Sequence, residues 1–202
     1  MGLEVMMFYE LTLAMDLLQL FKSFYNIDQE AYDVLKEEFI TKTFSRGSYL
    51  VKPGLIQHNF YFVNKGIQMA YFDTGDKQHV INFTYPPYPC AIPGSFMLQK
   101  PATYYLKCLT ESEFNYISYD TLQQLFEKSQ KIERLFRKMT EHLLAGTLKR
   151  YIELHSLTIE EQFKIFTQRS PHLLQLIPHK YIASYLGIDP TNFSKLFNSV
   201  KI

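Results

Sequence analysis

The stretch that decides the fold lies near the C-terminus and reads Tyr181-Ile182-Ala183-Ser184-Tyr185-Leu186-Gly187-Ile188-Asp189-Pro190-Thr191-Asn192-Phe193-Ser194-Lys195. The small Ala183 lets two helices cross closely, and Gly187 suits the positive φ that ends a helix. Asp189 can cap a second helix, and Pro190 fits its first position, where no N–H is needed. This order of residues predicts a helix-turn-helix near the end of the chain.

The second helix of this motif is expected to have two unlike faces. On a helical wheel the apolar side chains gather on one side, namely Phe193, Leu196, Phe197 and Val200. The other side carries short polar groups, namely Thr191, Lys195 and Asn198, with Asn192 and Ser194 on the flanks. Such groups can contact base edges and phosphates. The alternative interpretation is an ordinary helical hairpin with a solvated polar face.

The charge distribution divides the chain near the same place. Residues 1–130 hold 10 Lys and Arg against 14 Asp and Glu, a net charge of −4. Residues 131–202 hold 11 against 6, a net charge of +5. A basic end behind an acidic front is typical of a polyanion-binding module joined to a domain that does not touch the polyanion. Chance asymmetry is the alternative.

The rest of the chain changes from a strand-like to a helical pattern. A helix is predicted over 28–40, and β-prone runs separated by turn residues follow at 44–51, 60–63, 67–72, 79–83, 104–109 and 114–118. Helical spacing begins at Asp120, and residues 132–154 contain no proline, which predicts an unusually long helix. One more helix is predicted over 158–166. The expected class is α+β: an antiparallel β-roll (jelly roll), a long helix and a small helical module.

The N-terminal stretch, residues 1–21, is apolar but interrupted by Glu4, Glu10 and Asp16. This pattern predicts an amphipathic helix packed on the protein, and neither a signal peptide nor a membrane-spanning helix. We therefore expect a cytoplasmic protein with no membrane partner.

Cysteine and histidine usage argues against several chemistries. Cys90 and Cys108 are too few for a disulfide framework, a four-thiolate zinc site or an iron–sulfur cluster, and we expect reduced thiols. A metal-dependent cupin enzyme needs a His-x-His pattern, which this sequence lacks. We expect no metal site and no enzyme activity, while haem ligation by His58, His79 or Cys90 stays open.

Two stretches resemble a known family. The string 181–188 followed by Pro190-Thr191-x-x-Ser194-Lys195 is similar to the helix-turn-helix of the cyclic-AMP receptor protein/Fnr (Crp/Fnr) regulators, in particular the branch common in Bacteroidetes. Asn59-Phe60-Tyr61-Phe62-Val63-Asn64-Lys65-Gly66 resembles a strand and glycine turn of their cyclic-nucleotide-binding β-roll. The resemblance covers about residues 25–202. It implies N-terminal helices and a β-roll sensor domain over 1–120, a long dimerisation helix over 121–156 and a DNA-binding domain over 157–202.

The resemblance implies a sequence-specific transcription regulator that binds double-stranded DNA as a homodimer, with RNA polymerase as a further partner. The implied DNA-binding residues are His179, Lys180, Thr191, Asn192, Ser194, Lys195, Asn198 and Lys201. Lys195 stands where an arginine typically reads guanine, so weaker discrimination is expected. The dimer contact is expected at Leu135, Phe136, Met139 and Leu143. The sequence ends at Ile202, so we do not expect the two-stranded wing of the family.

The expected nucleotide-binding segment, residues 91–105, contains neither Glu nor Arg, and Ala102 falls where the family has its arginine. A buried phosphate without a cation is costly, so cyclic AMP is not expected to bind. No cofactor is identified. Seven residues could instead line a pocket for an unknown small apolar effector, although core packing is the more common role of such aromatics: Tyr85, Tyr88, Phe96, Thr103, Tyr104, Tyr105 and Lys107.

A second function stays open from the sequence. The chain can also be interpreted as a ligand-sensing or protein-interaction module whose helix-turn-helix no longer binds DNA, because Pro190 offers no donor where a contacting side chain often projects. Salt-dependent affinity for DNA distinguishes the two.

Overall fold

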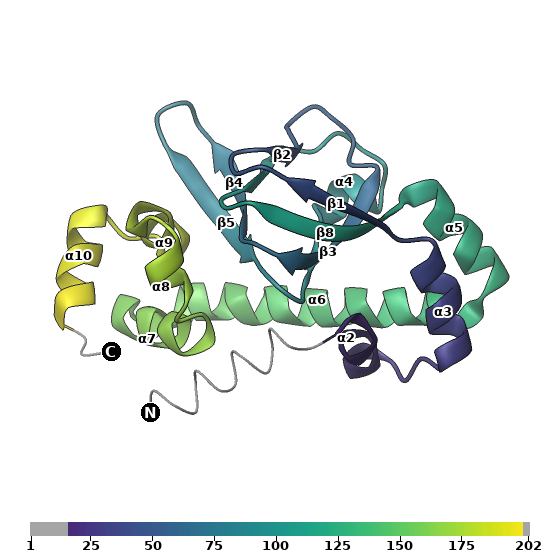
Figure 1. The fold of residues 1–202 in the computed structure, drawn as a ribbon. Coiled ribbons are helices and arrows are strands. Elements are labelled where there is room, and N and C mark those ends of the chain that lie inside the picture. The colour runs from purple at the N-terminus through teal and green to yellow at the C-terminus, as the bar shows by residue number, and fades with distance from the viewer. Residues whose placement is uncertain (1–15, 200–202) are drawn as a thin grey trace.

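The computed structural model describes residues 16–199. A β-roll of two antiparallel sheets lies above a long helix, α6 (Gln130–Ser156), and a group of short helices packs at each end of the roll (Figure 1). The α+β class and the long helix predicted from the sequence are confirmed. Within the described part, no helix is long and apolar enough to cross a membrane.

The two sheets of the roll each have four strands. The first has the order β1 (Ile40–Phe44), β8 (Ser112–Ser118), β3 (Asn59–Lys65) and β6 (Pro89–Cys90). The second has the order β2 (Tyr49–Val51), β7 (Tyr105–Cys108), β4 (Gln68–Asp73) and β5 (Gln78–Thr84). Side chains from both sheets, among them Val63, Leu106 and Phe114, form one buried core, which therefore fills the interior of the roll.

Strand β3 explains why the run 60–63 is continuously apolar. Tyr61 and Val63 point into the core between the sheets, whereas Phe60 and Phe62 point outward into a second core with the helices. A strand buried on both faces does not alternate between apolar and polar residues. The first sheet is therefore sandwiched between the second sheet and the helices.

The helices that cover this sheet are α2 (Leu17–Phe24), α3 (Gln29–Glu37), α5 (Tyr119–Lys128) and the first half of α6. Asp16 and Asp28 cap α2 and α3 by accepting backbone N–H groups, as expected of aspartate at helix starts. The helix predicted over residues 1–21 falls mainly outside the described residues, and its described part belongs to α2.

Three boundaries differ from the sequence prediction. The helix over 28–40 ends at Glu37, and Ile40 to Phe44 instead pair with β8 as β1. The single run 44–51 instead spans the end of β1, a turn with Gly47 at φ 87° and then β2. The segment 121–156 is two helices rather than one, because Ser129 takes an extended conformation, ends α5 and caps α6.

The C-terminal module contains α7 (Ile159–Arg169), α8 (Leu173–Leu176), α9 (His179–Leu186) and α10 (Pro190–Ser199). Its apolar side chains share one buried core with the outer face of the second sheet, through Met69, Tyr71 and Phe83. The module is therefore docked on the roll.

Two short elements of the roll, β6 and α4 (Pro93–Phe96), were not predicted from the sequence.

Candidate DNA-binding site

The turn between α9 and α10 has the predicted geometry. Gly187 ends α9 in the left-handed conformation, at φ 70° and ψ 24°. The N–H of Gly187 donates to the carbonyl of Ser184 at 3.1 Å, and the N–H of Ile188 donates to that of Ala183 at 2.9 Å. Ala183 and Ile188 are both buried. Residues with a Cβ rarely adopt this φ, so glycine is what allows the chain to reverse here.

The start of α10 is capped as the sequence predicts. Asp189 Oδ1 accepts the backbone N–H of Thr191 at 2.8 Å, and the carbonyl of Asp189 accepts the N–H of Phe193 at 2.9 Å. The hydrogen bond from the Thr191 backbone is the main cause that lowers the pKa of Asp189. Pro190 occupies the first position of the helix. The N-terminal end of α10 is therefore held in place by this cap. It carries the positive end of the helix dipole, and it is the end with which a recognition helix contacts bases.

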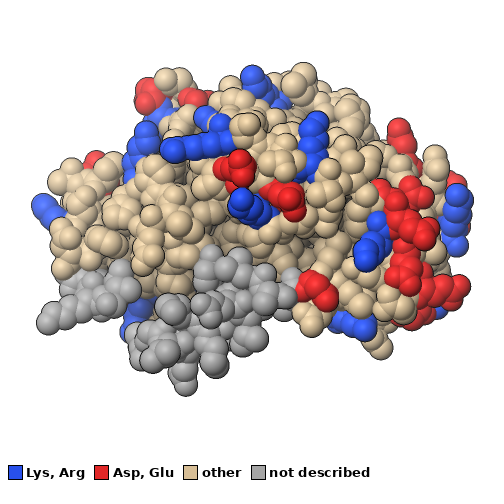
Figure 2. Space-filling model, in the orientation of Figure 1, with Lys and Arg blue, Asp and Glu red and all other residues tan. Residues whose placement is uncertain are grey.

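The two faces of α10 are divided as predicted. Phe193 is 1% exposed and packs in the module core. The polar side chains expected to face DNA are all exposed, namely Thr191, Asn192, Ser194, Lys195 and Asn198. Acidic side chains gather at the opposite end of the molecule, where α3 and α5 lie (Figure 2). The polar face of α10 is thus available to an anionic partner, away from this acidic cluster.

The residues implied at the start of α9 have different places. Lys180 is exposed, with its ammonium group 5.1 Å from the ring centre of Tyr181. His179 Nε2 lies 3.0 Å from the carbonyl oxygen of Leu174, and its ring lies 4.6 Å from that of Phe197. His179 therefore links α8, α9 and α10, and its implied contact with a phosphate stays a prediction. Lys201 lies outside the described residues.

The predicted dimer contact needs correction. Leu135, Phe136 and Met139 are buried within one chain, in the core that α6 shares with the first sheet. They cannot face a second chain without unfolding this core. Of the predicted set, Leu143 is exposed.

The exposed apolar residues of α6 lie further along the helix. Leu144, Leu148, Tyr151 and Ile152 are each at least 55% exposed and follow one another at steps of four, three and one residues. This spacing places them on one side of the helix. We call these four residues the α6 stripe. The spacing was visible in the sequence, but the sequence did not show which apolar residues the chain would bury.

The seven residues expected to line an effector pocket are not brought together. Phe96 is buried in the core under the helices, Tyr104 packs against the core between the sheets, and Tyr105 stacks on Tyr71 at 4.8 Å on the outer face. Of the remaining four, Thr103 is exposed and Lys107 lies beside Tyr49. Only Tyr85 and Tyr88 meet, with ring centres 6.0 Å apart, and Tyr85 also contacts the C-terminal module. A shared pocket formed by this set is therefore not present in the structure.

Polar groups of segment 91–105 are hydrogen-bonded within the protein. The N–H of Ile92 donates to Gln57 Oε1 at 2.8 Å, and the hydroxyl of Ser95 accepts from the Gln57 N–H and donates to the Lys100 carbonyl. Ala102 is 4% exposed in the core between the sheets. Backbone donors that could hold an anion at the start of α4 are thus partly taken by Gln57. Among the described residues, no group of three or more His, Cys, Asp or Glu is placed to hold a metal ion.

The junction of the roll with the module rests on contacts that the sequence did not reveal. Ser184 of α9 donates to the carbonyl of Gln78 at 2.7 Å and accepts the N–H of Val80 at 3.0 Å, which covers the edge of β5. The Arg150 guanidinium of α6 lies 4.1 Å from the ring centre of Tyr185 and donates to its carbonyl. These contacts hold the first helix of the motif against both the roll and the long helix.

A buried histidine at this junction predicts sensitivity to acid. Burial lowers the pKa of His172 to about 4, and its ring lies 4.5 Å from that of Tyr85. An unfolded histidine titrates near 6.5, so between pH 6.5 and 4 the unfolded state binds more protons and stability falls as the pH falls. We expect His172→Gln to flatten the dependence of unfolding free energy on pH in this window, measured by urea titration. An unchanged slope would contradict this assignment.

Comparison with solved structures finds the same architecture in other proteins. No protein-family model and no curated protein matches this sequence. The chain is similar to the c-di-GMP-responsive global regulator CLP of Xanthomonas campestris, with a TM-score of 0.61, 17% identity and coverage of 85% of this chain and 90% of that one. FixK2 of Bradyrhizobium japonicum follows with a TM-score of 0.66, 13% identity and coverage of 79% and 83%.

A third similar structure is a transcriptional regulator of the Crp/Fnr family from Eubacterium rectale, with a TM-score of 0.66, 10% identity and coverage of 86% of this chain and 83% of that one. The chain therefore has the fold of Crp/Fnr regulators, as the sequence predicted. At these identities the likeness concerns the fold, and function has to be argued from the site.

Proposed function

We propose that this chain, which has the Crp/Fnr fold, is a transcription regulator that binds double-stranded DNA through α10. The observation that carries the proposal is the exposed polar face of α10. The helix follows a glycine turn, is capped by Asp189 and is held in its orientation by the apolar core of the module. A buried or apolar outer face would have indicated packing instead. Contact with RNA polymerase, the remaining partner implied by the sequence, belongs to the same proposal.

The proposal includes a homodimer formed through the α6 stripe. Two leucines, an isoleucine and a tyrosine on one helix face are left exposed by the chain's own packing. Placing this face against its copy removes apolar surface from water. The proposal requires the two copies of α10 to lie about 34 Å apart, the spacing of successive major grooves. A pseudo-palindromic DNA site is expected.

The central test is DNA binding across a salt series with Lys195→Ala. We expect the substitution to weaken specific binding by about 1–3 kcal/mol and to lower the salt dependence, because Lys195 projects from the open face of α10. Fragments of the DNA upstream of the protein's own gene are the first substrates, with binding measured by fluorescence anisotropy.

The matched control is Lys128→Ala. Lys128 is also exposed and its loss changes the charge equally, but it ends α5 at the far end of the molecule from α10 (Figure 1). The DNA affinity of the Lys128→Ala variant should match that of the wild type. Equal losses for the two variants would indicate binding by overall charge. No salt-sensitive binding by the wild type would favour the alternative, a sensing module that has lost its DNA.

We further propose that cyclic AMP is not the effector. The interior of the roll is filled by side chains, and Gln57 accepts the N–H of Ile92 just before α4. The sequence also has no arginine between Arg46 and Arg134. A ligand present at about 100 times its dissociation constant stabilises a protein by about 2.7 kcal/mol. We expect millimolar cyclic AMP to leave the melting temperature unchanged. A saturable rise would overturn this part of the proposal.

A further inference from the structure

Tyr185 of α9 is in contact with three other parts of the molecule. Its ring packs on Phe83 of β5, with ring centres 5.4 Å apart, and on Phe166 of α7 at 5.6 Å. Its hydroxyl accepts a hydrogen bond from Arg169 Nη2 at 3.2 Å. On the side of α6, the Arg150 guanidinium lies 4.1 Å from the ring centre and donates from Nη2 to the Tyr185 carbonyl at 2.9 Å. One residue of the helix-turn-helix is therefore held by the long helix, by α7 and by the roll.

The charges of this cluster make its arrangement specific. Glu153, about one turn further along α6, is 8% exposed, and its Oε2 lies 3.9 Å from Arg169 Nη1. Burial lowers the pKa of the Arg150 guanidinium, which still stays charged at neutral pH. A buried charge is costly unless it is paired and hydrogen-bonded. A placement of α9 that moved Tyr185 away from Arg150 would leave a partly buried guanidinium without its acceptor.

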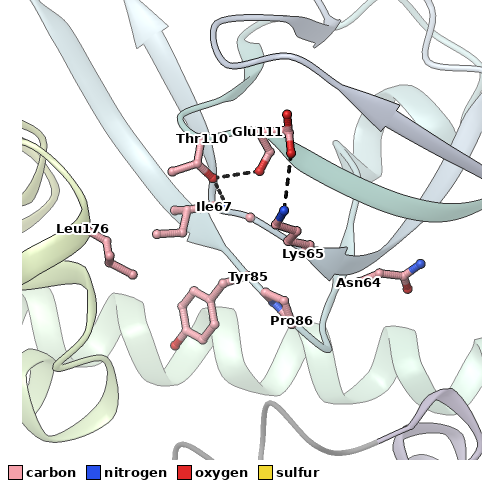
Figure 3. A pocket seen from close by; sticks show the side chains of 9 residues that line it. Asn64, Lys65, Ile67, Tyr85, Pro86, Thr110, Glu111 and Leu176 are labelled. Carbon is pink, nitrogen blue, oxygen red and sulfur yellow. Dashed lines mark hydrogen bonds and ion pairs between the residues drawn. The ribbon is translucent and has the colours of Figure 1, made fainter.

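The apolar contact between the roll and the module is not continuous. A cleft of about 370 Å³ opens between Ile67 and Tyr85 on the roll and Leu176 of α8, which is 56% exposed (Figure 3). Side chains of the two parts therefore do not interlock along the whole junction. Apolar attraction has no preferred direction, whereas a hydrogen bond does. The directional contacts of Ser184 with β5 and of Arg150 with α9 therefore specify the orientation of the module, and that of Arg150 fixes it relative to α6.

Arg150 and the α6 stripe lie on opposite sides of the same part of the helix. Leu148 and Ile152 of the stripe each stand two positions from Arg150, which is about 200° around an α-helix. The stripe is the proposed contact with the second chain, and α10 begins at Pro190, close behind Tyr185 in the sequence. The path from the dimer contact to the recognition helix therefore runs through Arg150 and one short turn.

We propose that Arg150 is a positioning residue that sets the separation and angle of the two recognition helices in the dimer, and thereby the half-site spacing that the protein selects. The inference rests on the proposed function. Arginine suits this role because its planar guanidinium lies on an aromatic ring and donates a hydrogen bond at the same time, whereas the lysine ammonium has no planar fork. Arg150 thus controls which DNA sites fit without touching DNA.

The first test uses the full chain without DNA. Residual dipolar couplings of backbone N–H groups report the orientation of α9 and α10 relative to the roll. We expect the couplings of the wild type to fit the arrangement in Figure 1 with one alignment tensor, and those of Arg150→Ala not to fit it. Arg137→Ala is the matched control, because Arg137 is an arginine of the same helix that pairs with Glu141. Its couplings should fit as those of the wild type do.

Arg150→Lys guards against a general loss of structure, because it keeps the charge and most of the side chain. We expect its couplings to depart from the single-tensor fit in the same direction as those of Arg150→Ala, but less. A single-tensor fit of either variant that is as good as that of the wild type would overturn the inference. So would a wild type whose roll and module already require two tensors.

The second test measures DNA affinity on palindromes whose half-sites are moved by one base pair in either direction. Such a move displaces a half-site by about 3.4 Å and rotates it by about 34°. We expect it to weaken binding by the wild type and by Arg137→Ala about tenfold, and binding by Arg150→Ala less than about threefold. The wild type and Arg150→Ala should bind a single half-site equally, since the contacts of α10 are unchanged.

Equal spacing preference in the wild type and Arg150→Ala would contradict the inference, as would a wild type that binds all spacings alike. The two proposals remain separable because the dipolar couplings need no DNA. A wild type that binds no DNA, with couplings that change as expected in Arg150→Ala, contradicts the proposed function. A wild type that binds DNA, with couplings unchanged in the Arg150 variants, contradicts this inference alone.

Discussion

The double variant Leu148→Glu/Ile152→Glu is expected to be monomeric at micromolar concentration and to lose specific DNA binding. The two residues are 55% and 62% exposed in one chain and lie on the α6 stripe. Full burial of each apolar side chain contributes about 1.5–3 kcal/mol, and a two-fold contact uses four of them. Replacing them with carboxylates also brings like charges together. We expect the dimer dissociation constant to rise by at least about 1,000-fold.

Sedimentation velocity of the wild type and the variant measures this directly. The control is Leu55→Glu/Leu98→Glu, which changes two leucines that are 59% and 62% exposed on the roll. It adds the same charge and should stay dimeric. A wild type that is monomeric with and without DNA, or equal behaviour of the two variants, would contradict the dimer. DNA affinity should fall with the dimer, because a single α10 reads one half-site.

Replacing Gly66 with alanine is expected to destabilise the protein strongly. Gly66 has φ 94° between β3 and β4, and a Cβ there would lie 2.4 Å from the carbonyl oxygen of Glu111 and 2.8 Å from the Cα of Ser112. These are backbone atoms that cannot turn aside. The left-handed conformation costs about 1–2 kcal/mol and overpacking about 1–3 kcal/mol, so we expect a loss of about 3 kcal/mol or more in unfolding free energy.

Gly75→Ala separates the two costs. Gly75 has a nearly identical φ of 93° at the β4–β5 turn, but a Cβ there would meet nothing within 4 Å. Its loss should be limited to the conformational cost, about 1–2 kcal/mol. Urea unfolding of both variants gives the comparison. Similar losses at the two positions would show that the close approach to Glu111 is relieved by small backbone shifts.

The sequence by itself determined the local elements whose causes are local. A capping aspartate, a proline without an N–H and a glycine that accepts positive φ act within one or two turns of chain, so Gly187, Asp189 and Pro190 specified the helix-turn-helix and the open face of α10. Hydrophobic period likewise predicted most of the strands and the length of α6, but it missed the short β6 and did not predict β1 as a separate strand.

Only the tertiary structure decided which apolar residues remain exposed to solvent. Leu135 and Leu148 have the same helical spacing in the sequence, yet one is fully buried under the roll and the other is 55% exposed. That difference depends on where the roll ends along α6, which no local pattern encodes. The docking of Ser184 on β5 and the cleft beside Leu176 likewise join segments about 100 residues apart in sequence. Burial and partner choice are properties of the packed chain, because they depend on the surfaces that distant segments present to one another.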